Sequence, residues 1–294
     1  MTFWPNLYLI GVAKAATTTL HEILGQHPDI CMSSIKEPHY FTENIVDLGT
    51  DKTHNSLITN EEDYQALFKT CDEGKSLFKG ESSPSYFWEH GTARKIRQRN
   101  PDAKAVVILR NPLTRIMSHY NMDFRAGREQ EVDLLSAVRK DIDRTSKGWG
   151  ISRLYLELGL YHEALSNYSE EFGSSLKVLF YEDLRQNKDE FLEELFGFLG
   201  LAVPSLPSEP HANAGYYYSN KTKFLKRIPF SHLVPKSIKD KINGFLLSKK
   251  PEELSSSEVQ YLTEYYRQDQ INIAKDFGID RYLNAWSEEY GINF

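Results

Sequence analysis

The stretch that decides the fold of this 294-residue chain is LYLIGVAKAATTTL, residues 7–20. Its four leading apolar residues predict a short strand, which runs through a turn of small residues into a lysine and three threonines that open a helix. The first N–H groups and the positive dipole end of such a helix attract anions, and Lys14 adds a full charge. This turn is therefore a candidate phosphate-binding loop. The alternative is an ordinary strand-to-helix turn with a surface lysine.

The turn differs from the loop that binds nucleoside triphosphates. That loop has two glycines flanking four residues and ends in Gly-Lys-Ser/Thr. Here Lys14 follows Gly11 by only three residues, and Ala13 rather than glycine precedes the lysine. A nucleotide or sugar kinase, which would use a similar strand, loop and helix, is therefore the alternative enzyme class rather than the first one.

A second apolar run, residues 105–109, ends in RNPLTRIMSHY, residues 110–120. The continuous run predicts a buried strand, and Pro112 suits the first turn of a helix. Arg110 then lies at the carboxyl end of a strand, where ligands bind in open α/β sheets. A kinase would carry an aspartate for magnesium at such a place, whereas a guanidinium can grip a phosphate directly. Ser118 follows two turns into the helix.

Together the two segments resemble motifs of sulfotransferases that use 3′-phosphoadenosine 5′-phosphosulfate (PAPS), the family that includes the carbohydrate and heparan sulfotransferases. Residues 14–20 are similar to the family's Lys-x-x-Thr-Thr-x-Leu loop, and residues 110–120 to its Arg-Asn-Pro-x-x-Arg-x-x-Ser-x-Tyr motif. Four further segments also fit, in the family's order: KEPHYF at 36–41, GESSPSYF at 80–87, GLY at 159–161 and LFYEDL at 179–184. The resemblance thus covers about residues 7–201.

The resemblance implies a P-loop-like, three-layer α/β fold with a central, mostly parallel β-sheet flanked by helices. The alternation of expected strands and helices points to the same class. It also implies a reaction, the transfer of a sulfuryl group from PAPS to an acceptor hydroxyl, which leaves 3′,5′-adenosine bisphosphate (PAP) and needs no metal. The acceptor stays open among a carbohydrate, a glycolipid and another alcohol. A non-catalytic nucleotide-binding protein is the alternative of another class.

Two groups of side chains would hold the donor. The first group would bind the 5′-phosphosulfate and consists of Lys14, Ala15, Ala16, Thr17 and Thr18. The second, Arg110 with Ser118, would bind the 3′-phosphate that separates this donor from ATP. Lys14 would also stabilise the negative charge that grows toward the leaving phosphate. Ala16 stands where glycine is common in the family, which predicts a φ below zero at this position.

The acceptor hydroxyl needs a base, because its own pKa lies far above 7. Glu37 is the first candidate, since the similar segment in the carbohydrate sulfotransferases supplies a catalytic glutamate, and His39 is the rival. The alternative for Glu37 is a structural ion pair with Lys36. One departure matters here, because Ser82 stands where carbohydrate members often have a lysine, which removes a second cationic contact to the sulfuryl group.

Composition sets the remaining bounds. A hydrophobic content of 40% and a charged content of 26% are ordinary for a soluble globular protein, and 294 residues can form a single domain, residues 1–294. The net charge of −6 argues against a nucleic-acid partner. No apolar run is long enough to span a bilayer, and residues 1–6 lack the features of a signal peptide. Two cysteines are too few for a disulfide framework, so we expect reduced thiols and a cytoplasmic protein.

The periodicity of apolar residues, together with glycine and proline signals, predicts the order of elements. Strands are expected at residues 7–10, 30–32, 77–79, 105–109 and 176–180. Helices are expected at residues 17–25, 61–68, 92–99, from 112 onward, 131–144, 152–172, 188–199 and 256–277. Residues 211–218 are expected to form a loop, and Trp286 to pack back on the domain.

Overall fold

The computed structural model describes residues 4–43, 58–71, 76–149, 152–205, 217–218, 247–248 and 254–279. Contacts within the chain separate two compact units, each described here by itself. The first comprises Met1–Asn111 and Ser146–Ala212, and the second comprises Pro112–Thr145 and Asn213–Phe294. The single domain over residues 1–294 stays a prediction.

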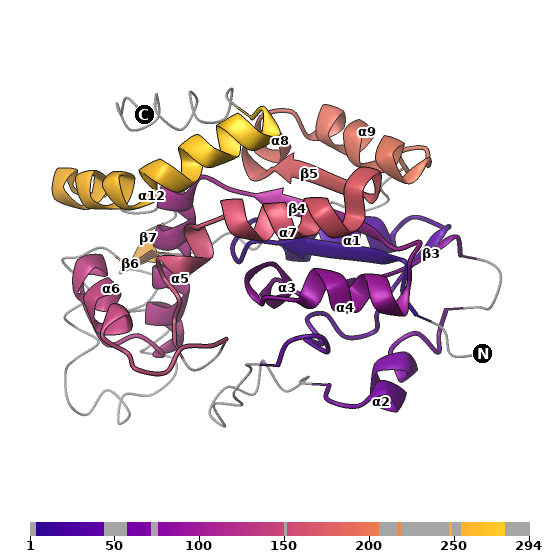
Figure 1. Ribbon diagram of the computed structural model, residues 1–294, viewed down its shortest axis with the longest axis horizontal. Coiled ribbons are helices and arrows are strands. Elements are labelled where there is room, and N and C mark those ends of the chain that lie inside the picture. Colours follow the sequence, from indigo (N-terminus) through magenta and orange to yellow (C-terminus); the bar gives the residue numbers. More distant parts are fainter. Residues whose placement is uncertain are drawn as a thin grey trace. The chain divides into compact units, whose positions relative to one another are not determined.

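A five-stranded, fully parallel sheet forms the centre of the first unit (Figure 1). Its strands are β1 (Leu7–Gly11), β2 (Ile30–Met32), β3 (Phe78–Ser82), β4 (Lys104–Leu109) and β5 (Leu176–Phe180), in the order β2-β3-β1-β4-β5. Every residue of β1 is buried, because its continuous apolar run is covered on both faces. The carboxyl ends of all five strands meet at one edge, which includes Gly11 and Ser82.

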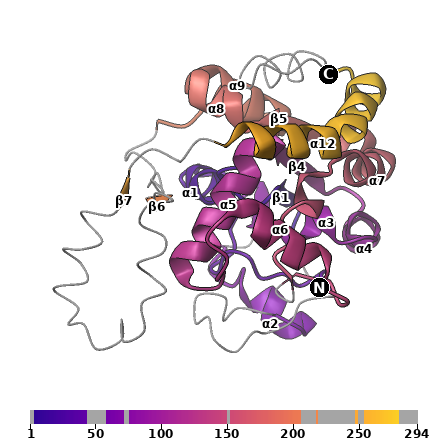
Figure 2. The same ribbon diagram turned by 90° about the vertical axis from the view of Figure 1, so that its left-hand side faces the viewer.

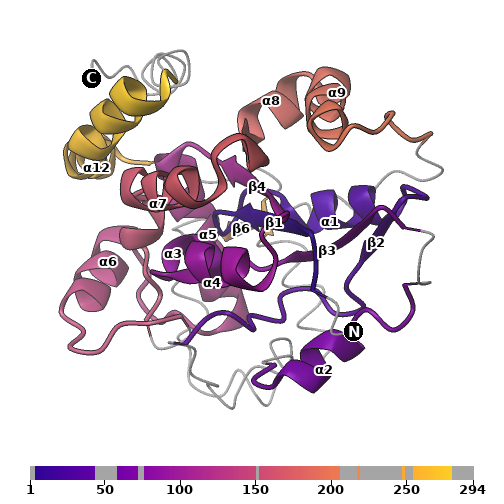
Figure 3. The same cartoon turned by 45° about the vertical axis from the view of Figure 1, so that its right-hand side comes forward.

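Helices cover both faces of this sheet, as Figures 1 and 3 show. One face carries α1 (Thr17–Gly25), α8 (Tyr181–Gln186) and α9 (Lys188–Leu199), and the other carries α3 (Ser85–Trp88), α4 (Thr92–Arg99) and α7 (His162–Phe172). The short helix α2 (Glu61–Ala66) begins at Asn60, whose side chain accepts from the N–H of Asp63. The predicted three-layer α/β class with a parallel sheet is confirmed.

The expected helix at residues 152–172 is wrong in its first half. Only α7 is an α-helix there, and it is preceded by a bridge between Trp149 and Ser152 and by a short 3₁₀ helix, Glu157–Gly159. Leu154 adopts a left-handed backbone with φ 50°, which an α-helix cannot contain. The apolar residues here are buried because the segment packs inward as a loop, not because they form one helical face.

The second unit contains three helices and a two-stranded ribbon within its described residues (Figure 2). They are α5 (Pro112–Ala126), α6 (Leu134–Ile142), α12 (Ser256–Phe277), and the antiparallel strands β6 (Tyr217–Tyr218) and β7 (Leu247–Ser248). The helix α5 starts at Pro112, as predicted, and packs against both α6 and α12. A capping box between Ser255 and Glu258 opens α12. Apart from β6, the expected loop at 211–218 lies outside the described residues, as does Trp286.

No helix in the described part of the chain is both long and apolar enough to cross a membrane.

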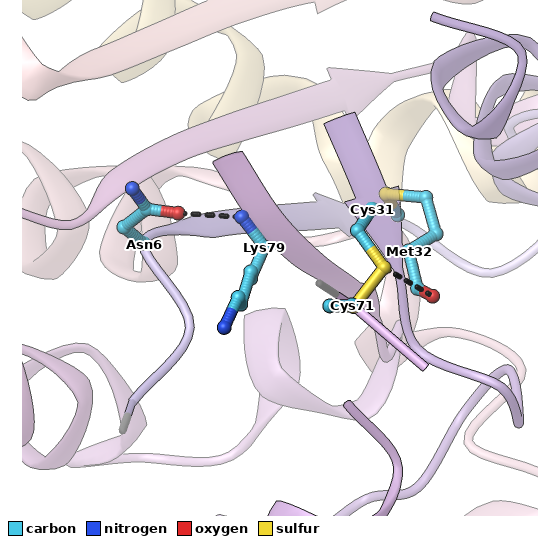
Figure 4. The surroundings of a disulfide bond; sticks show 5 residues. All are labelled: Asn6, Cys31, Met32, Cys71 and Lys79. Carbon is cyan, nitrogen blue, oxygen red and sulfur yellow. Dashed lines mark hydrogen bonds between the residues drawn. A yellow bond between two sulfur atoms is a disulfide. The ribbon is translucent and has the colours of Figure 1, made fainter. Parts of the chain in front are cut away.

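The two cysteines contradict the expectation of reduced thiols, since Cys31 and Cys71 form a disulfide with a Cα–Cα distance of 5.7 Å. Figure 4 shows the bond between the edge strand β2 and the segment that follows α2. Forty positions separate the two residues in sequence, so their proximity is a property of the fold and not of any local pattern. The expectation of a cytoplasmic protein rested partly on reduced cysteines and loses that support.

The start of the sheet is held next to this bond. Asn6 precedes β1, and its side-chain oxygen accepts from the N–H of Lys79 at 2.7 Å (Figure 4). Its amide nitrogen also donates to the carbonyl of Leu77 at 2.9 Å. These contacts fix the register at which β1 and β3 begin, and thereby the level at which both strands end.

Candidate active site

The loop between β1 and α1 has an unusual backbone. Lys14 and Ala16 have positive φ values of 78° and 63°, and Ala16 is the N-cap residue of α1. The expectation of a negative φ at Ala16 is therefore wrong. The loop must turn sharply to point the first N–H groups of α1 at the carboxyl edge of the sheet, and that geometry outweighs a strain of roughly 1–3 kcal/mol for alanine in the left-handed region.

Gly11 is needed where this loop begins. A Cβ atom at Gly11 would lie 2.3 Å from Cγ2 of Thr17, which is buried at the first turn of α1. The N–H of Val12 donates to the carbonyl of Ile108 at 3.0 Å, which ties the loop to β4. The residues present fit an anionic group, because a helix N-terminus, two hydroxyl side chains and the Lys14 ammonium belong to one short loop.

Arg110 joins the two predicted phosphate motifs. It follows β4, and its Nη1 donates to the carbonyl of Lys14 at 2.7 Å. Its guanidinium also lies over the ring of Tyr181, 4.4 Å from the ring centre. The structure thus places Lys14 and Arg110 at the same edge of the sheet, as the parallel arrangement requires.

The two later motifs hold the backbone around this arginine. The hydroxyl of Tyr161 donates to the carbonyl of Arg110 at 2.7 Å. The N–H of Asn111 donates to the carboxylate of Glu182 at 2.9 Å. These contacts explain why the Gly-Leu-Tyr and Tyr-Glu-Asp segments belong to the motif set, since each supports the turn that aims Arg110.

Ser118 lies on α5, in the second unit, and is half-buried. On the same helix Arg115 is fully buried, and its Nη1 lies 3.4 Å from Nδ1 of His119. Nε2 of His119 is 3.3 Å from the Asp123 carboxylate, which also pairs with Arg128 at 2.9 Å. This row of hydrogen-bonded and charged side chains supports α5 within its own unit.

The candidate bases lie on the segment that follows β2. Glu37 and His39 have positive φ values of 59° and 54°, and both are held to the end of β3. The N–H of Glu37 donates to the carbonyl of Ser82 at 2.9 Å, and the N–H of His39 donates to Oγ of Ser83 at 3.2 Å. Two left-handed residues other than glycine, separated only by Pro38, mark a strained segment, and such backbone strain is often found at functional sites.

The Glu37 carboxylate has two charged neighbours. Its Oε1 contacts the ammonium of Lys36, and its Oε2 lies 3.8 Å from Nε2 of His39. The ion pair with Lys36 that we considered as the alternative is therefore present. The same carboxylate nevertheless faces His39 with its second oxygen, so the pairing does not consume both oxygens.

Ser82, the departure from the family pattern, contacts a histidine of α1. Its hydroxyl lies 2.9 Å from Nδ1 of His21. Burial, followed by the nearby Lys36 ammonium, lowers the pKa of His21 to about 4, against an opposing effect of Glu37. His21 is therefore neutral near pH 7 and does not replace the lysine that Ser82 lacks.

Glu81 is a buried group that sequence reasoning missed. It is fully buried on β3 and accepts from the hydroxyls of Tyr64 at 2.5 Å, Ser83 at 2.8 Å and Tyr86 at 2.9 Å. Burial raises the pKa of Glu81 to about 7, although the three hydrogen bonds oppose that rise. The strand expected at residues 77–79 stopped short of Glu81, whereas β3 extends to Ser82, and for this reason the burial of Glu81 was not predicted.

No group of three or more histidine, cysteine, aspartate or glutamate side chains that could hold a metal ion occurs among the residues the structure describes.

Comparison with known proteins gives the family. The sequence model described as the sulfotransferase domain matches residues 5–270. The chain belongs to this family. The resemblance read from the motifs is thereby confirmed.

Individual relatives agree with this assignment. The chain is 28% identical over 172 residues to heparan sulfate glucosamine 3-O-sulfotransferase 6 of Mus musculus, a match that covers 58% of this chain and 45% of the relative. The chain thus spans about half the length of the first curated relatives it matches.

Solved structures show the same fold. The sulfotransferase from Alicyclobacillus acidocaldarius is similar with a TM-score of 0.73 and 24% identity, covering 97% of this chain and 99% of that one. Mouse sulfotransferase SULT7A1 complexed with PAP has a TM-score of 0.54 at 12% identity, covering 96% and 89% of the two chains.

Proposed function

We propose that this protein is a sulfotransferase that moves a sulfuryl group from PAPS to an acceptor hydroxyl. The observation that carries the proposal is the hydrogen bond from Arg110 to the carbonyl of Lys14, because it brings a guanidinium to the loop at the start of α1. Family membership supports the donor class, and a structural neighbour is recorded in complex with PAP.

The donor would be held at its two phosphate ends. Lys14, the backbone at Ala15 and Ala16, and the hydroxyls of Thr17 and Thr18 would bind the 5′-phosphosulfate. Arg110 and Ser118 would bind the 3′-phosphate. The donor supplies the sulfuryl group and a good leaving phosphate, and Lys14 would stabilise the negative charge that develops there. The proposal includes no metal.

Glu37 would serve as the base for the acceptor hydroxyl. It is half-buried at the carboxyl edge of the sheet, beside the segment that ends β3, and carries the carboxylate that proton removal needs. Lys36, in contact with the same carboxylate, supplies a positive charge near the place where Ser82 supplies none. His39 would orient the carboxylate and the acceptor.

The acceptor class would be a carbohydrate or another hydroxyl-bearing molecule. Support comes from the curated relatives, whose names state heparan sulfate or carbohydrate as the substrate. The net charge of −6 favours a neutral or weakly charged acceptor over a densely sulfated polymer.

The donor assignment is tested by thermal unfolding in the presence of nucleotides. PAP should raise the melting temperature, whereas AMP, and ATP with magnesium, should do much less, because only PAP carries the 3′-phosphate and binding to the native state stabilises it. Equal shifts with AMP and PAP would show that the 3′-phosphate is not recognised. Transfer of ³⁵S from labelled PAPS to a panel of glycosides and simple alcohols then identifies the acceptor class.

A further inference from the structure

We propose that Ser85 and Thr42 are positioning residues of the reaction, acting through His39. Their hydroxyls hold the His39 ring in the tautomer that carries its proton on Nε2, so that His39 donates toward Glu37 and does not compete with it as a base. This inference rests on the proposed function, in which Glu37 removes the acceptor proton.

The contacts form a continuous row. Oγ1 of Thr42 lies 2.8 Å from Oγ of Ser85, and Oγ of Ser85 lies 2.7 Å from Nδ1 of His39. On the far side of the ring, Nε2 of His39 lies 3.8 Å from Oε2 of Glu37. Ser85 is fully buried, and Thr42 and His39 are 8% and 5% exposed. The row runs from the buried interior to the half-buried carboxylate.

The direction of the hydrogen bonds follows from counting protons. Each hydroxyl has one proton to donate, and a neutral imidazole has one nitrogen that donates and one that accepts. Within the described residues, the hydroxyl of Thr42 contacts only Ser85, so its proton goes to Ser85. Ser85 then donates to Nδ1 of His39, which must be the accepting nitrogen. The ring proton is therefore on Nε2.

The opposite direction is disfavoured at both ends of the row. A proton on Nδ1 would make Ser85 donate to Thr42 and leave the Thr42 proton with no acceptor among the described residues. It would also turn the lone pair of Nε2 toward the carboxylate of Glu37, which is an electron-rich group. With the proton on Nε2, both hydroxyls and Nδ1 have hydrogen-bond partners of the right kind, and the Nε2 proton lies on the side of the ring that faces the Glu37 carboxylate, 3.8 Å away, a favourable charge contact longer than a hydrogen bond.

The ring is fixed by its other neighbours as well. Its centre lies 5.7 Å from that of Trp149, and its backbone N–H donates to Ser83, which in turn donates to Glu81. The charged or titratable groups that face this region are Glu37 and Lys36 on the same segment, His21 on α1, and Glu81 on β3. A ring held in this way can orient a carboxylate but cannot turn to take a proton itself.

The tautomer is measured directly by long-range ¹H–¹⁵N correlation of the ¹⁵N-histidine-labelled full chain. The signal of His39 is assigned by its loss in His39→Asn. At about pH 8, where an ordinary imidazole is neutral, we expect the wild type to show protonated Nε2 and unprotonated Nδ1. Ser85→Ala should mix the two tautomers. Protonated Nδ1 in the wild type would overturn the proposal.

Kinetics separate positioning from folding. With ³⁵S-labelled PAPS and the acceptor identified in the panel of glycosides and simple alcohols, Ser85→Ala and Thr42→Val should each lower kcat about tenfold while leaving the KM for PAPS unchanged. Thr42→Ser keeps the hydroxyl and should retain the wild-type kcat. Thr92→Val removes a buried hydroxyl on α4, outside this row, and should also leave kcat unchanged. Equal losses in Thr42→Ser and Thr42→Val would show that packing, not the hydrogen bond, matters at this position.

Different measurements decide the tautomer of His39 and the proposed sulfotransferase function. The tautomer measurement needs neither donor nor acceptor, so it decides the proposal even for a chain that transfers no sulfuryl group. Failure of PAP to bind would count against the proposed function and would leave the measured tautomer as it stands.

Discussion

The hydroxyl of Tyr161 donates to the carbonyl of Arg110 at 2.7 Å, across 51 positions of sequence. Arg110 in turn donates to the carbonyl of Lys14, so one tyrosine supports the contact between the two phosphate motifs. Tyr161 can therefore influence the binding of PAPS or PAP without contacting the nucleotide itself.

Tyr161→Phe should therefore weaken PAP binding by about five- to tenfold, the equivalent of one lost hydrogen bond of about 1 kcal/mol. The measurement is isothermal titration with PAP. Tyr168→Phe is the matched control, because the Tyr168 hydroxyl donates to the carbonyl of Tyr86 at 2.9 Å, away from Arg110. The control should lose a similar amount of stability and no affinity. Equal affinity losses in both variants would remove Arg110 from the explanation.

Glu37→Gln should be nearly inactive yet still bind PAP, because the amide keeps the shape of the side chain and cannot take a proton. His39→Asn should retain measurable turnover. The wild-type activity should stay level from about pH 6 upward, since carboxyl groups ordinarily ionise near pH 4, whereas a histidine base would lose activity below roughly pH 6.5. An active glutamine variant beside an inactive asparagine variant would assign the base to His39.

Reduction of the Cys31–Cys71 bond should lower the free energy of unfolding by up to about 4 kcal/mol, the loop-closure value for its sequence separation of 40. Urea unfolding with and without a reductant measures the difference. A Cys31→Ser, Cys71→Ser double variant should match the reduced protein and ignore the reductant. The loop that the bond closes contains Glu37 and His39, so the same comparison of turnover shows whether the bond also orders the candidate base.

Ala16→Gly should raise the free energy of unfolding by about 1 kcal/mol. Glycine adopts the left-handed conformation at φ 63° without strain, which stabilises the folded state. The greater conformational freedom of glycine in the unfolded chain offsets only part of this gain in stability. The matched variant Ala15→Gly should be destabilising, because Ala15 is fully buried and is not among the residues with positive φ. A destabilised Ala16→Gly protein would contradict the strain at this position.

The pH dependence of stability has two opposing contributions in this region. The pKa of Glu81 is raised from 4.5 to about 7, so its contribution to stability is present below pH 4.5 and is lost as the pH rises toward 7. The pKa of His21 is lowered from 6.5 to about 4, so its contribution is present above pH 6.5 and is lost as the pH falls toward 4. Each pKa unit corresponds to about 1.4 kcal/mol.

The difference in the free energy of unfolding, variant minus wild type, should therefore become more positive for Glu81→Gln as the pH rises from 4.5 to 7. For His21→Asn the same difference should become more negative as the pH rises from 4 to 6.5. Urea unfolding at a series of pH values checks both slopes. The two variants serve as controls for each other, because an effect common to both would have the same sign. Parallel slopes would show that neither group titrates as its burial requires.

Most regular elements were predictable because their signals are local. The strand β5, the helix α4 and the helix α9 have the predicted bounds, and Gly200 ends α9 in a left-handed conformation as a C-terminal glycine should. The short helices α3 and α8 were missed, since four and six residues are too few to show a period of 3.6.

The features that escaped sequence reasoning are those that depend on distant partners. The disulfide and the row from Thr42 to His39 join residues that the fold brings together across 40 positions or more, and the hydroxyl of Tyr64 reaches Glu81 across 17 positions. The positive φ of Ala16 was not predicted for another reason. A loop that is held at both ends can impose a backbone angle that alanine on its own disfavours. Motif order located the candidate site, but not the contacts that support it.

The carboxylate of Glu81 has an evolutionary consequence. Oε1 of Glu81 accepts from Tyr64 on α2 and from Tyr86 on α3, and Oε2 accepts from Ser83 at the end of β3, so a change at Glu81 alone would remove the acceptor of three hydroxyls at once. Positions 64, 81, 83 and 86 should therefore covary in an alignment of homologues. A homologue with an apolar residue at position 81 should also have phenylalanine in place of both tyrosines, because their hydroxyls would no longer have the carboxylate as an acceptor.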